Sequence, residues 1–366
     1  ESLTIVCIAA WALQIVRRLE SAGVGLPRSR ADLRRLGGQI ASCVLAVPLD
    51  WRGLDGAWAF FVAAAIGSLL VSRHLAVSLR ELRTTVLEPA LFYLLITRHP
   101  LSRPEPQSKR LILLADALVF AGAALSAQGL WQYFGGDAIV AEGVRRVRGI
   151  YASPNNLSLV LGRILPLAIA LAWQGQTRWR RIAYAITAAL MLSCLFLTFS
   201  RGAWLLGLPA ALLFLAAMHG RRAAWIAVAV VVAFLALIPV AGTERIASLL
   251  DPTAGTTLFR LSLWKSALAM IRDHPLAGIG LDNFLYYYRQ YILPEAAAEP
   301  NLSHPHNLVL DFWLRLGLGG LGVLAWFAAG LVRRGVHLIR RLRGGDLRSL
   351  TVGLLASGVY ALANGL

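Results

Sequence analysis

The residues best suited to chemistry lie in a polar segment between apolar runs, residues 259–322. Within it the sequence HPHN places His304 and His306 directly before an apolar run. A neutral imidazole titrates near neutrality and can take a proton from a hydroxyl, so His306 is a candidate general base. Two alternatives stay open: Asn307 caps a helix beside incidental histidines, or the two histidines bind a metal. Because the segment HPHN offers no third ligand, we expect no metal site and no cofactor.

Two further positions bear on this base. Asp311 follows His306 by about one helical turn, and it either orients the base or pairs with Arg315 four residues on.

Arginines form the second candidate set, because a guanidinium binds phosphate oxygens through two hydrogen bonds. They fall in the segment RRVRG, in the short turn SRG and in a segment of helical periodicity at 258–273: Arg145, Arg146, Arg148, Arg201 and Arg260. Each group has a structural alternative, namely an interfacial anchor, a snorkelling helix-end arginine and an amphipathic helix on the membrane surface. Arg289 is a further candidate for an anionic contact.

The composition predicts the elements that must position these residues. The chain has 366 residues, of which 57% are hydrophobic, and 33 glycines. A soluble domain cannot bury so much apolar surface, so we expect an all-α, polytopic integral membrane protein of about 10–12 transmembrane helices. The net charge of +17 then reflects Lys and Arg in cytoplasmic loops, and no nucleic-acid partner is expected. The three cysteines show no paired spacing, which argues against a disulfide framework.

Ten apolar runs are suited to crossing a membrane: 2–16, 36–49, 54–72, 111–133, 157–173, 182–199, 203–218, 223–241, 308–332 and 349–366. An eleventh run, 86–97, is short for a span and is interpreted as re-entrant or interfacial. If it does not cross, two thirds of the Lys and Arg residues share one side, which the positive-inside rule makes the cytoplasm. In that arrangement residues 73–110 form one cytoplasmic loop. The chain is then a single transmembrane domain, 1–366, with a periplasmic helical loop at 242–307.

Several motifs in this order resemble a known family. They are RVRGIYASPNN, then TFSRGAWL, then Arg260 followed four residues later by Trp264 and by HPLAGIGLDNF, and last HPHN followed by LGLGGLG. Their order and spacing resemble the O-antigen ligase and O-antigen polymerase superfamily of bacterial envelopes. The resemblance covers roughly residues 143–322, whereas the earlier part matches only as a row of apolar helices.

The resemblance implies a metal-independent, inverting glycosyltransferase in the bacterial inner membrane, with its active site facing the periplasm. Its donor would be an undecaprenyl-diphosphate-linked glycan, and in the ligase branch its acceptor would be lipid A-core oligosaccharide among membrane lipids. Arg201 and Arg260 match the arginines assigned to the donor diphosphate, and His306 matches the proposed base. Arg315 is a departure, since similar proteins often carry an acid there. We expect six further residues to contact the substrate: Arg145, Arg146, Arg148, Arg289, His304 and Asn307.

Other functions remain open from the sequence. The nearest is a polymerase that joins lipid-linked repeat units, and no residue separates it from a ligase. A small-anion or bicarbonate transporter is more distant, because it would need polar groups along a path through the membrane. A structural scaffold needs no outward-facing set of Arg and His residues.

Overall fold

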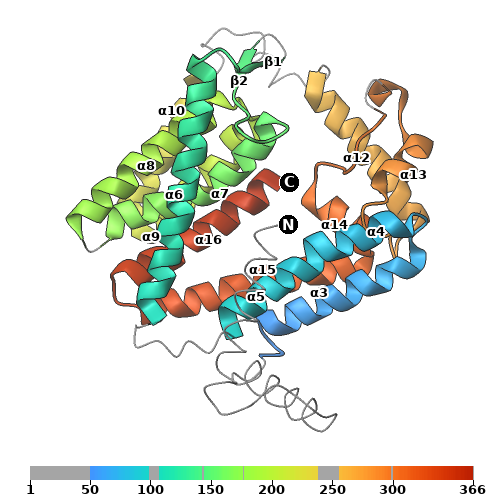
Figure 1. The fold of residues 1–366 in the computed structure, drawn as a ribbon, viewed down its shortest axis with the longest axis horizontal. Helices are drawn as coiled ribbons and strands as arrows, with labels where there is room; N and C mark the ends of the chain where they lie inside the picture. Colours follow the sequence, from blue (N-terminus) through green and yellow to red (C-terminus); the bar gives the residue numbers. More distant parts are fainter. Residues whose placement is uncertain are drawn as a thin grey trace, which may run out of the picture.

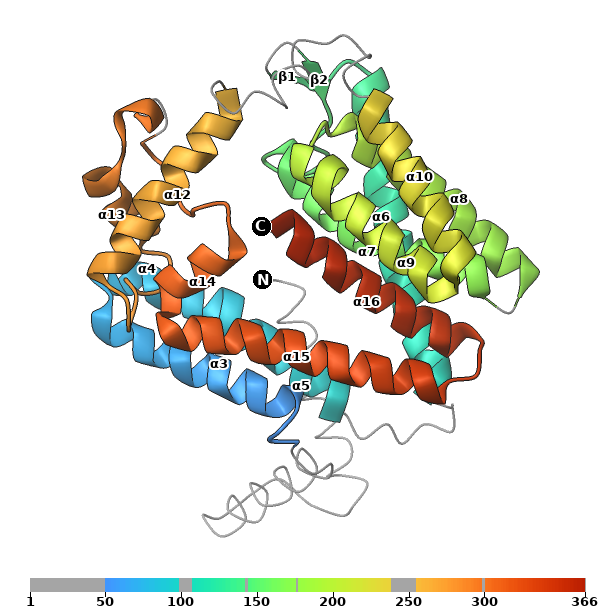
Figure 2. The ribbon, with the colours of Figure 1, turned by 180° about the vertical axis from the view of Figure 1, so that it is seen from behind.

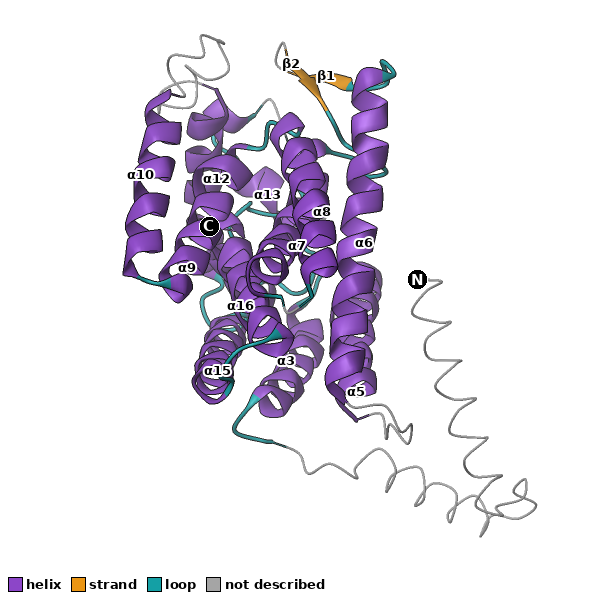
Figure 3. Cartoon of the chain, turned by 90° about the vertical axis from the view of Figure 1, so that its left-hand side faces the viewer, coloured by secondary structure: helices purple, strands orange, loops and turns teal. Residues whose placement is uncertain are grey.

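The computed structural model describes residues 50–98, 107–141, 144–175, 177–237, 255–297 and 300–365. These residues are almost entirely helical, which confirms the all-α class (Figure 3). The only strands among them are a short hairpin, β1 (Ile139–Ala141) and β2 (Val144–Arg146). Five described helices are long and apolar enough to cross a membrane, which confirms a polytopic membrane protein. The runs 2–16 and 36–49, and the start of the loop 242–307, lie outside the described residues.

One group of helices, here called the α7 bundle, surrounds α7 (Figure 1). Ser153 caps α7, because its side chain accepts a hydrogen bond from the backbone N–H of Asn156 at 3.2 Å. Gly162 lies against the ring of Tyr360, where a Cβ atom would come within 1.8 Å. The bundle comprises α6 (Gln107–Phe134), α7 (Pro154–Gln174), α8 (Arg178–Leu197), η3 (Ala203–Gly207), α9 (Leu208–His219), α10 (Arg221–Leu237) and α16 (Asp346–Gly365).

The second group, here called the α12 unit, combines long helices with short ones. It contains α3 (Leu54–Ser68), η1 (Leu69–Val71), α4 (Leu75–Glu81), η2 (Leu82–Leu87), α5 (Glu88–Arg98), α12 (Gly255–Asp273), α13 (Phe284–Tyr291), η5 (Pro294–Ala296), α14 (Leu308–Leu316) and α15 (Leu318–Arg341). Figures 1 and 2 show it facing the α7 bundle, with α15 leading into α16. The end of α16 approaches the start of α14, where Gly365 lies against Leu308.

The apolar run 308–332 is one span by composition, but the structure breaks it between α14 and α15. Gly317 occupies the left-handed region with φ 62°, and a Cβ there would lie 1.9 Å from the carbonyl oxygen of Leu276. The preceding loop is bonded to this break, because Ile279 N–H donates to Leu314 O at 2.7 Å and Leu318 N–H donates to Leu276 O at 3.0 Å. The glycine-rich motifs HPLAGIG and LGLGGLG therefore fix the short helix α14 in place.

The structure makes most of residues 73–98 helical, whereas the topology expected for residues 73–110 stays a prediction. Residues Leu75–Arg98 form one unbroken helical path through α4, η2 and α5 that packs against α3. At its start, the N–H of His74 donates to Asn283 Oδ1 at 3.0 Å, so this end lies beside the loop that follows α12. Charged residues interrupt the first half of this path, and Glu81 among them is ion-paired with Arg315. The re-entrant or interfacial placement expected for residues 86–97 stays a prediction.

Candidate active site

A cavity of about 470 Å³ lies between the α7 bundle and the α12 unit. The start of α7, the turn at Ser200–Gly202 and the end of α16 form one wall, while Arg260 and residues 301–311 form the other. Its polar lining residues are Ser153, Asn155, Asn156, Ser158, Arg163, Ser200, Arg260, Asn301, Ser303, His304, His306, Asn307, Asp311 and Asn364. Segments far apart in the sequence thus meet at one site.

The HPHN loop brings its two imidazole rings together in this cavity. The ring centroids of His304 and His306 are 4.1 Å apart. Asn307 caps α14, because its Oδ1 accepts hydrogen bonds from the N–H groups of Val309 and Leu310 at 3.0 and 3.1 Å, which confirms the capping interpretation. His306 has a φ of 53°, an uncommon conformation for a residue other than glycine. Such strain persists only where the surroundings hold the backbone in place.

Trp264 supplies one of these supports. Its indole N–H donates to the carbonyl oxygen of Pro305 at 3.1 Å, between the two histidines. Arg260 lies one helical turn before Trp264 on α12 and lines the cavity. The spacing of Arg260 and Trp264 therefore lets a single helix contribute a cation to the cavity and hold the histidine loop.

The electrostatic surroundings keep the histidines neutral. Burial, together with the charges of nearby His304 and Arg260, lowers the pKa of His306 to about 4. The pKa of His304 is also lowered, mainly by burial, although the charge of Asp311 opposes this shift. Burial lowers the pKa of Arg260 as well, but a guanidinium remains charged in proteins. Near neutral pH the site therefore holds a neutral imidazole beside a fixed cation.

Arg163 is a cavity residue that the sequence analysis did not assign to the site. It lies near the middle of α7, and its side chain is exposed in the cavity wall. The signal was present in the sequence, because a charged residue inside an apolar run usually marks function. Because apolar residues surround it in the sequence, Arg163 was treated as part of a membrane span and not as a site residue.

Arg201 lies in the helical turn that leads into η3, just after the turn at Thr198 and Phe199. The residues on both sides of it, Ser200 and Gly202, line the cavity, whereas Arg201 is half-buried and is not among the lining residues. Its proximity to the site agrees with the sequence analysis, but its role in binding a diphosphate stays a prediction.

The remaining predicted arginines do not line the cavity. Arg146 is buried, and it donates from Nε to Thr198 O at 2.8 Å and from Nη2 to Asn155 Oδ1 at 3.0 Å, so it holds one cavity residue. Arg289 donates to Asn301 Oδ1 at 2.7 Å and holds another. On the surface, Arg145 donates to Tyr133 O at 2.6 Å and lies over the ring of that residue, and Arg148 is exposed. Direct substrate contact by these four residues stays a prediction.

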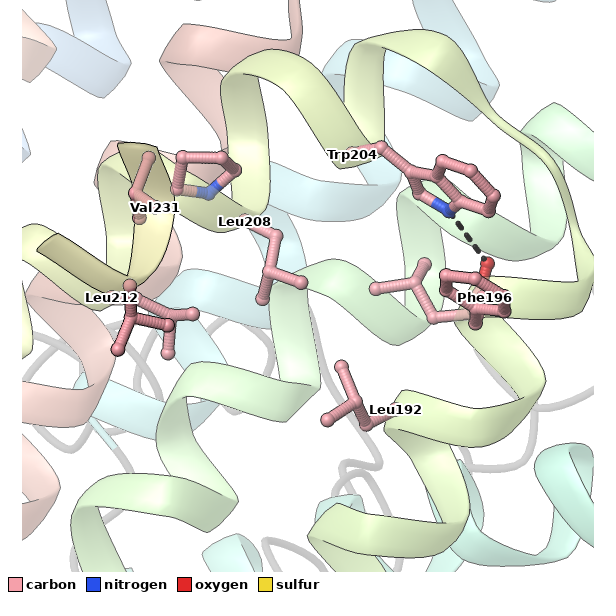
Figure 4. Close-up of a pocket in the computed structure, with 9 residues that line it drawn as sticks. Leu192, Phe196, Trp204, Leu208, Leu212 and Val231 are labelled. Atoms are coloured by element: carbon pink, nitrogen blue, oxygen red, sulfur yellow. Dashed lines mark hydrogen bonds between the residues drawn. The ribbon is translucent and has the colours of Figure 1, made fainter. Parts of the chain in front are cut away.

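An apolar groove of about 260 Å³ lies next to the turn at Ser200–Gly202 (Figure 4). Trp204 and Phe196 stack at its end with ring centroids 4.4 Å apart, and the indole N–H of Trp204 points to Leu195 O at 3.5 Å. Its other walls come from α8, α9 and α10: Leu192, Leu208, Pro209, Leu212, Val230 and Val231. Such a lining suits a hydrocarbon chain and offers no polar recognition.

Comparison with known proteins gives a family for part of the chain. The family model described as O-antigen ligase matches residues 186–325, which include the SRG turn, α12, the HPHN loop and the break before α15. No curated protein matches the chain significantly. The match supports a membrane glycosyltransferase of the ligase or polymerase type, acting on lipid-linked glycans in a membrane environment. Over residues 186–325 the chain matches the O-antigen ligase and polymerase superfamily, as the motifs predicted.

Proposed function

We propose that the protein is an O-antigen ligase of the bacterial inner membrane. It would transfer a glycan from undecaprenyl diphosphate to lipid A-core oligosaccharide at the periplasmic face, with inversion at the anomeric carbon and without a metal. The observation that carries this proposal is that His306 and Arg260 line one cavity. The charge of Arg260 contributes to the lowered pKa of His306, which keeps the imidazole neutral. A base and an anion-binding group thus share one cavity, which is what transfer from a glycosyl diphosphate requires.

The reaction assigns a role to each group. The acceptor hydroxyl oxygen forms a bond to the anomeric carbon while the bond from that carbon to the phosphate oxygen breaks. The electron pair of the broken bond stays on the diphosphate, and the hydroxyl proton goes to His306. Arg260, together with Arg201 and Arg163, would stabilise the developing charge through fixed electrostatics.

The low pKa of His306 fits this order of events. A base with a pKa of about 4 is a weak proton acceptor in the empty site. A bound diphosphate brings negative charge near the ring and raises its pKa toward the ordinary value. Proton affinity would therefore be highest when the donor is in place.

The apolar groove beside Trp204 supports a lipid-linked donor. It begins next to the turn that carries Arg201, so a diphosphate near this turn could extend its hydrocarbon chain into the groove. Membrane lipid is the alternative occupant, and competition between undecaprenyl phosphate and phospholipid for the purified protein would separate the two.

The central test is glycan transfer in liposomes, with chelator present, by the unaltered protein and by His306→Ala. We expect transfer by the unaltered protein and a loss of about 10²- to 10⁴-fold in the variant, the usual contribution of a positioned base. His219→Ala is the matched control, because His219 lies at the end of α9 and contacts Gln174 outside the cavity. Undiminished transfer by His306→Ala would remove His306 from the mechanism.

The product identifies the branch of the superfamily. Elongation of the lipid-linked glycan without transfer to lipid A-core would make the protein a polymerase. Uptake of a labelled anion without release of undecaprenyl diphosphate would make it a transporter.

A further inference from the structure

Arg146 does not line the cavity, but it holds two segments that do. It is 7% exposed, and its Nε donates to Thr198 O at 2.8 Å while its Nη2 donates to Asn155 Oδ1 at 3.0 Å. Thr198 precedes the turn at Ser200–Gly202, and Asn155 is the second residue of α7. One buried guanidinium therefore joins the start of α7 to the segment that leads to Arg201.

The contact with Arg146 fixes the direction in which the side-chain amide of Asn155 faces. A guanidinium carries only donors, so the atom that meets it is the amide oxygen and not the NH₂ group. Asn155 is exposed and lines the cavity. Among the described residues, none accepts a hydrogen bond from this NH₂ group. The oxygen is thus held by the protein, and the N–H donors remain for a molecule in the cavity.

The charges on this wall of the cavity indicate what such a donor can meet. Arg163 lies two turns further along α7 and also lines the cavity. The acidic residue among the described lining residues, Asp311, belongs to the opposite wall. The first turn of a helix also favours negative charge. A neutral N–H donor on a wall that carries a cation and no described acid suits an oxygen atom of a phosphate.

The position of Asn155 relates it to the glycan donor and not to the acceptor. One guanidinium joins it to Thr198, three residues before Arg201. The apolar groove beside Trp204 begins next to the same turn. A lipid diphosphate whose hydrocarbon chain occupies this groove would have its phosphates between the turn and the start of α7. The acceptor hydroxyl must approach His306, which lies on the opposite wall.

We propose that the NH₂ group of Asn155 donates a hydrogen bond to a phosphate oxygen of the lipid diphosphate donor, and that Arg146 is the positioning residue that orients this group. The inference rests on the proposed function, and it names the part of the donor that the α7 wall recognises. The same bond would form with undecaprenyl diphosphate, the product that leaves. Binding of this product therefore measures the bond without any transfer.

Asn155→Asp tests the direction of the hydrogen bond with little change in shape. Arg146 keeps an oxygen as its acceptor, so the pair becomes an ion pair and stays intact. The second carboxylate oxygen replaces the NH₂ group and repels a phosphate oxygen. We expect the Kd for undecaprenyl diphosphate, measured with the purified protein in detergent, to rise about 10-fold or more. An unchanged or lowered Kd would overturn the proposal, because a ligand that donates to Asn155 would tolerate the carboxylate.

Gln174→Glu is the matched control. Gln174 is the last residue of α7, its Oε1 accepts a hydrogen bond from Arg348 Nη1 at 3.3 Å, and it does not line the cavity. The substitution makes the same change from amide to carboxylate beside an arginine on the same helix. We expect the Kd for undecaprenyl diphosphate to stay within about twofold. Equal effects of Gln174→Glu and Asn155→Asp would overturn the proposal, since net charge and not the contact would then govern binding.

A double-mutant cycle tests the positioning role of Arg146. Arg146→Met leaves the amide of Asn155 free to rotate, so the Kd for undecaprenyl diphosphate should rise, and Arg146→Lys, which keeps a donor, should restore part of the affinity. In the background of Asn155→Ala, which has no amide to orient, Arg146→Met should raise the Kd by a smaller factor. The same factor in both backgrounds would overturn the positioning role, because a merely structural effect does not depend on Asn155.

Two further measurements separate this inference from the proposed function. Undecaprenol has the same hydrocarbon chain without phosphate, and we expect it to bind equally to the unaltered protein and to Asn155→Asp; weaker binding to the variant would overturn the phosphate contact. A raised Kd for undecaprenyl diphosphate in Asn155→Asp, in a protein that transfers no glycan, would reject the ligase function and retain the contact. Glycan transfer with an unchanged Kd in Asn155→Asp would retain the ligase function and reject the contact.

Discussion

The two walls of the cavity are held by different kinds of interaction. The α7 bundle depends on apolar packing, with Leu157, Leu161 and Leu165 fully buried in its core. The α12 unit also has an apolar core, but directional hydrogen bonds fix its short elements. Asn283 is the clearest case, since it is fully buried, donates to Ser72 Oγ, Ser78 Oγ and Leu281 O, and accepts from His74 N–H.

This difference follows from the kind of element that each wall contains. Apolar burial is non-directional and is sufficient to hold long helices side by side. A loop with a strained histidine and a short broken helix needs contacts of defined geometry, because packing alone would permit other conformations. The proposed base therefore lies on the wall whose hydrogen bonds determine its position.

After His306→Ala, the largest effect should come from removing the cation that lines the cavity with the histidines. Arg260→Gln should lower the rate of transfer by about 10²-fold or more, because the developing charge on the diphosphate loses a fixed positive partner. The measurement is the rate at saturating donor. Lys265→Gln, at an exposed position of the same helix α12 that does not line the cavity, is the control and should change the rate little. Similar losses in both variants would mean that overall positive charge, and not the cavity, governs the reaction.

A pair of core variants tests the contrast between the walls. Leu161→Ala should destabilise the α7 bundle by about 2–5 kcal/mol through a buried cavity. Asn283→Ala should cost about 3 kcal/mol, because several buried polar groups lose their partner. Only Asn283→Ala should also lower kcat in the protein that remains folded. The measurements are thermal unfolding and the rate per folded molecule. An equal fall in kcat for Leu161→Ala would show that the two walls do not differ in how they support the reaction.

Two tryptophans allow a finer comparison within the α12 unit. Trp264→Phe removes the hydrogen bond to Pro305 beside His306, and Trp313→Phe removes a similar bond of 2.9 Å to Pro275. We expect kcat to fall about 10-fold in the first variant, because a lost hydrogen bond costs roughly 1.4 kcal/mol and this energy corresponds to a tenfold change in rate. The KM for the donor should change little. The second variant should show a similar loss of stability and a smaller effect on kcat. Equal effects on kcat would assign both bonds a general structural role.

The smallest effect concerns pH. His306 has a pKa of about 4 in the folded protein, below its ordinary value of 6.5, so it should remain neutral in the empty site down to about pH 4. The acid limb of kcat, which reports the occupied site, should lie at higher pH than that of kcat/KM, because the bound diphosphate raises the pKa. Coincident limbs would contradict this electrostatic coupling.

The same pKa shift has a consequence for stability. As the pH falls below about 6.5, the unfolded chain binds a proton at His306 before the folded protein does, so the free energy of unfolding decreases until about pH 4. His306→Asn removes this contribution, and asparagine tolerates the positive φ. Its unfolding should therefore depend less on pH over this interval.

The sequence was sufficient for the fold class and for the order of the family motifs. Apolar runs predict helices because every backbone polar group in a membrane needs an internal partner. The helix cap at Asn307 was predicted from the segment HPHN and is confirmed, whereas the role of His306 as a base stays a prediction. The ion pair between Glu81 and Arg315 could not be predicted, because the two residues lie far apart along the chain.

The sequence by itself determined the all-α membrane architecture, the family motifs and the types of side chain available for chemistry, since these depend on local composition and short spacing. Tertiary structure alone decided that Arg163 faces the same cavity as Arg260, and that Arg146 and Arg289 hold other residues. It also decided that Arg315 forms ion pairs with both Asp311 and Glu81. The physical reason is that these properties depend on contacts between segments distant in the sequence, which determine the orientation, burial and charge environment of each group.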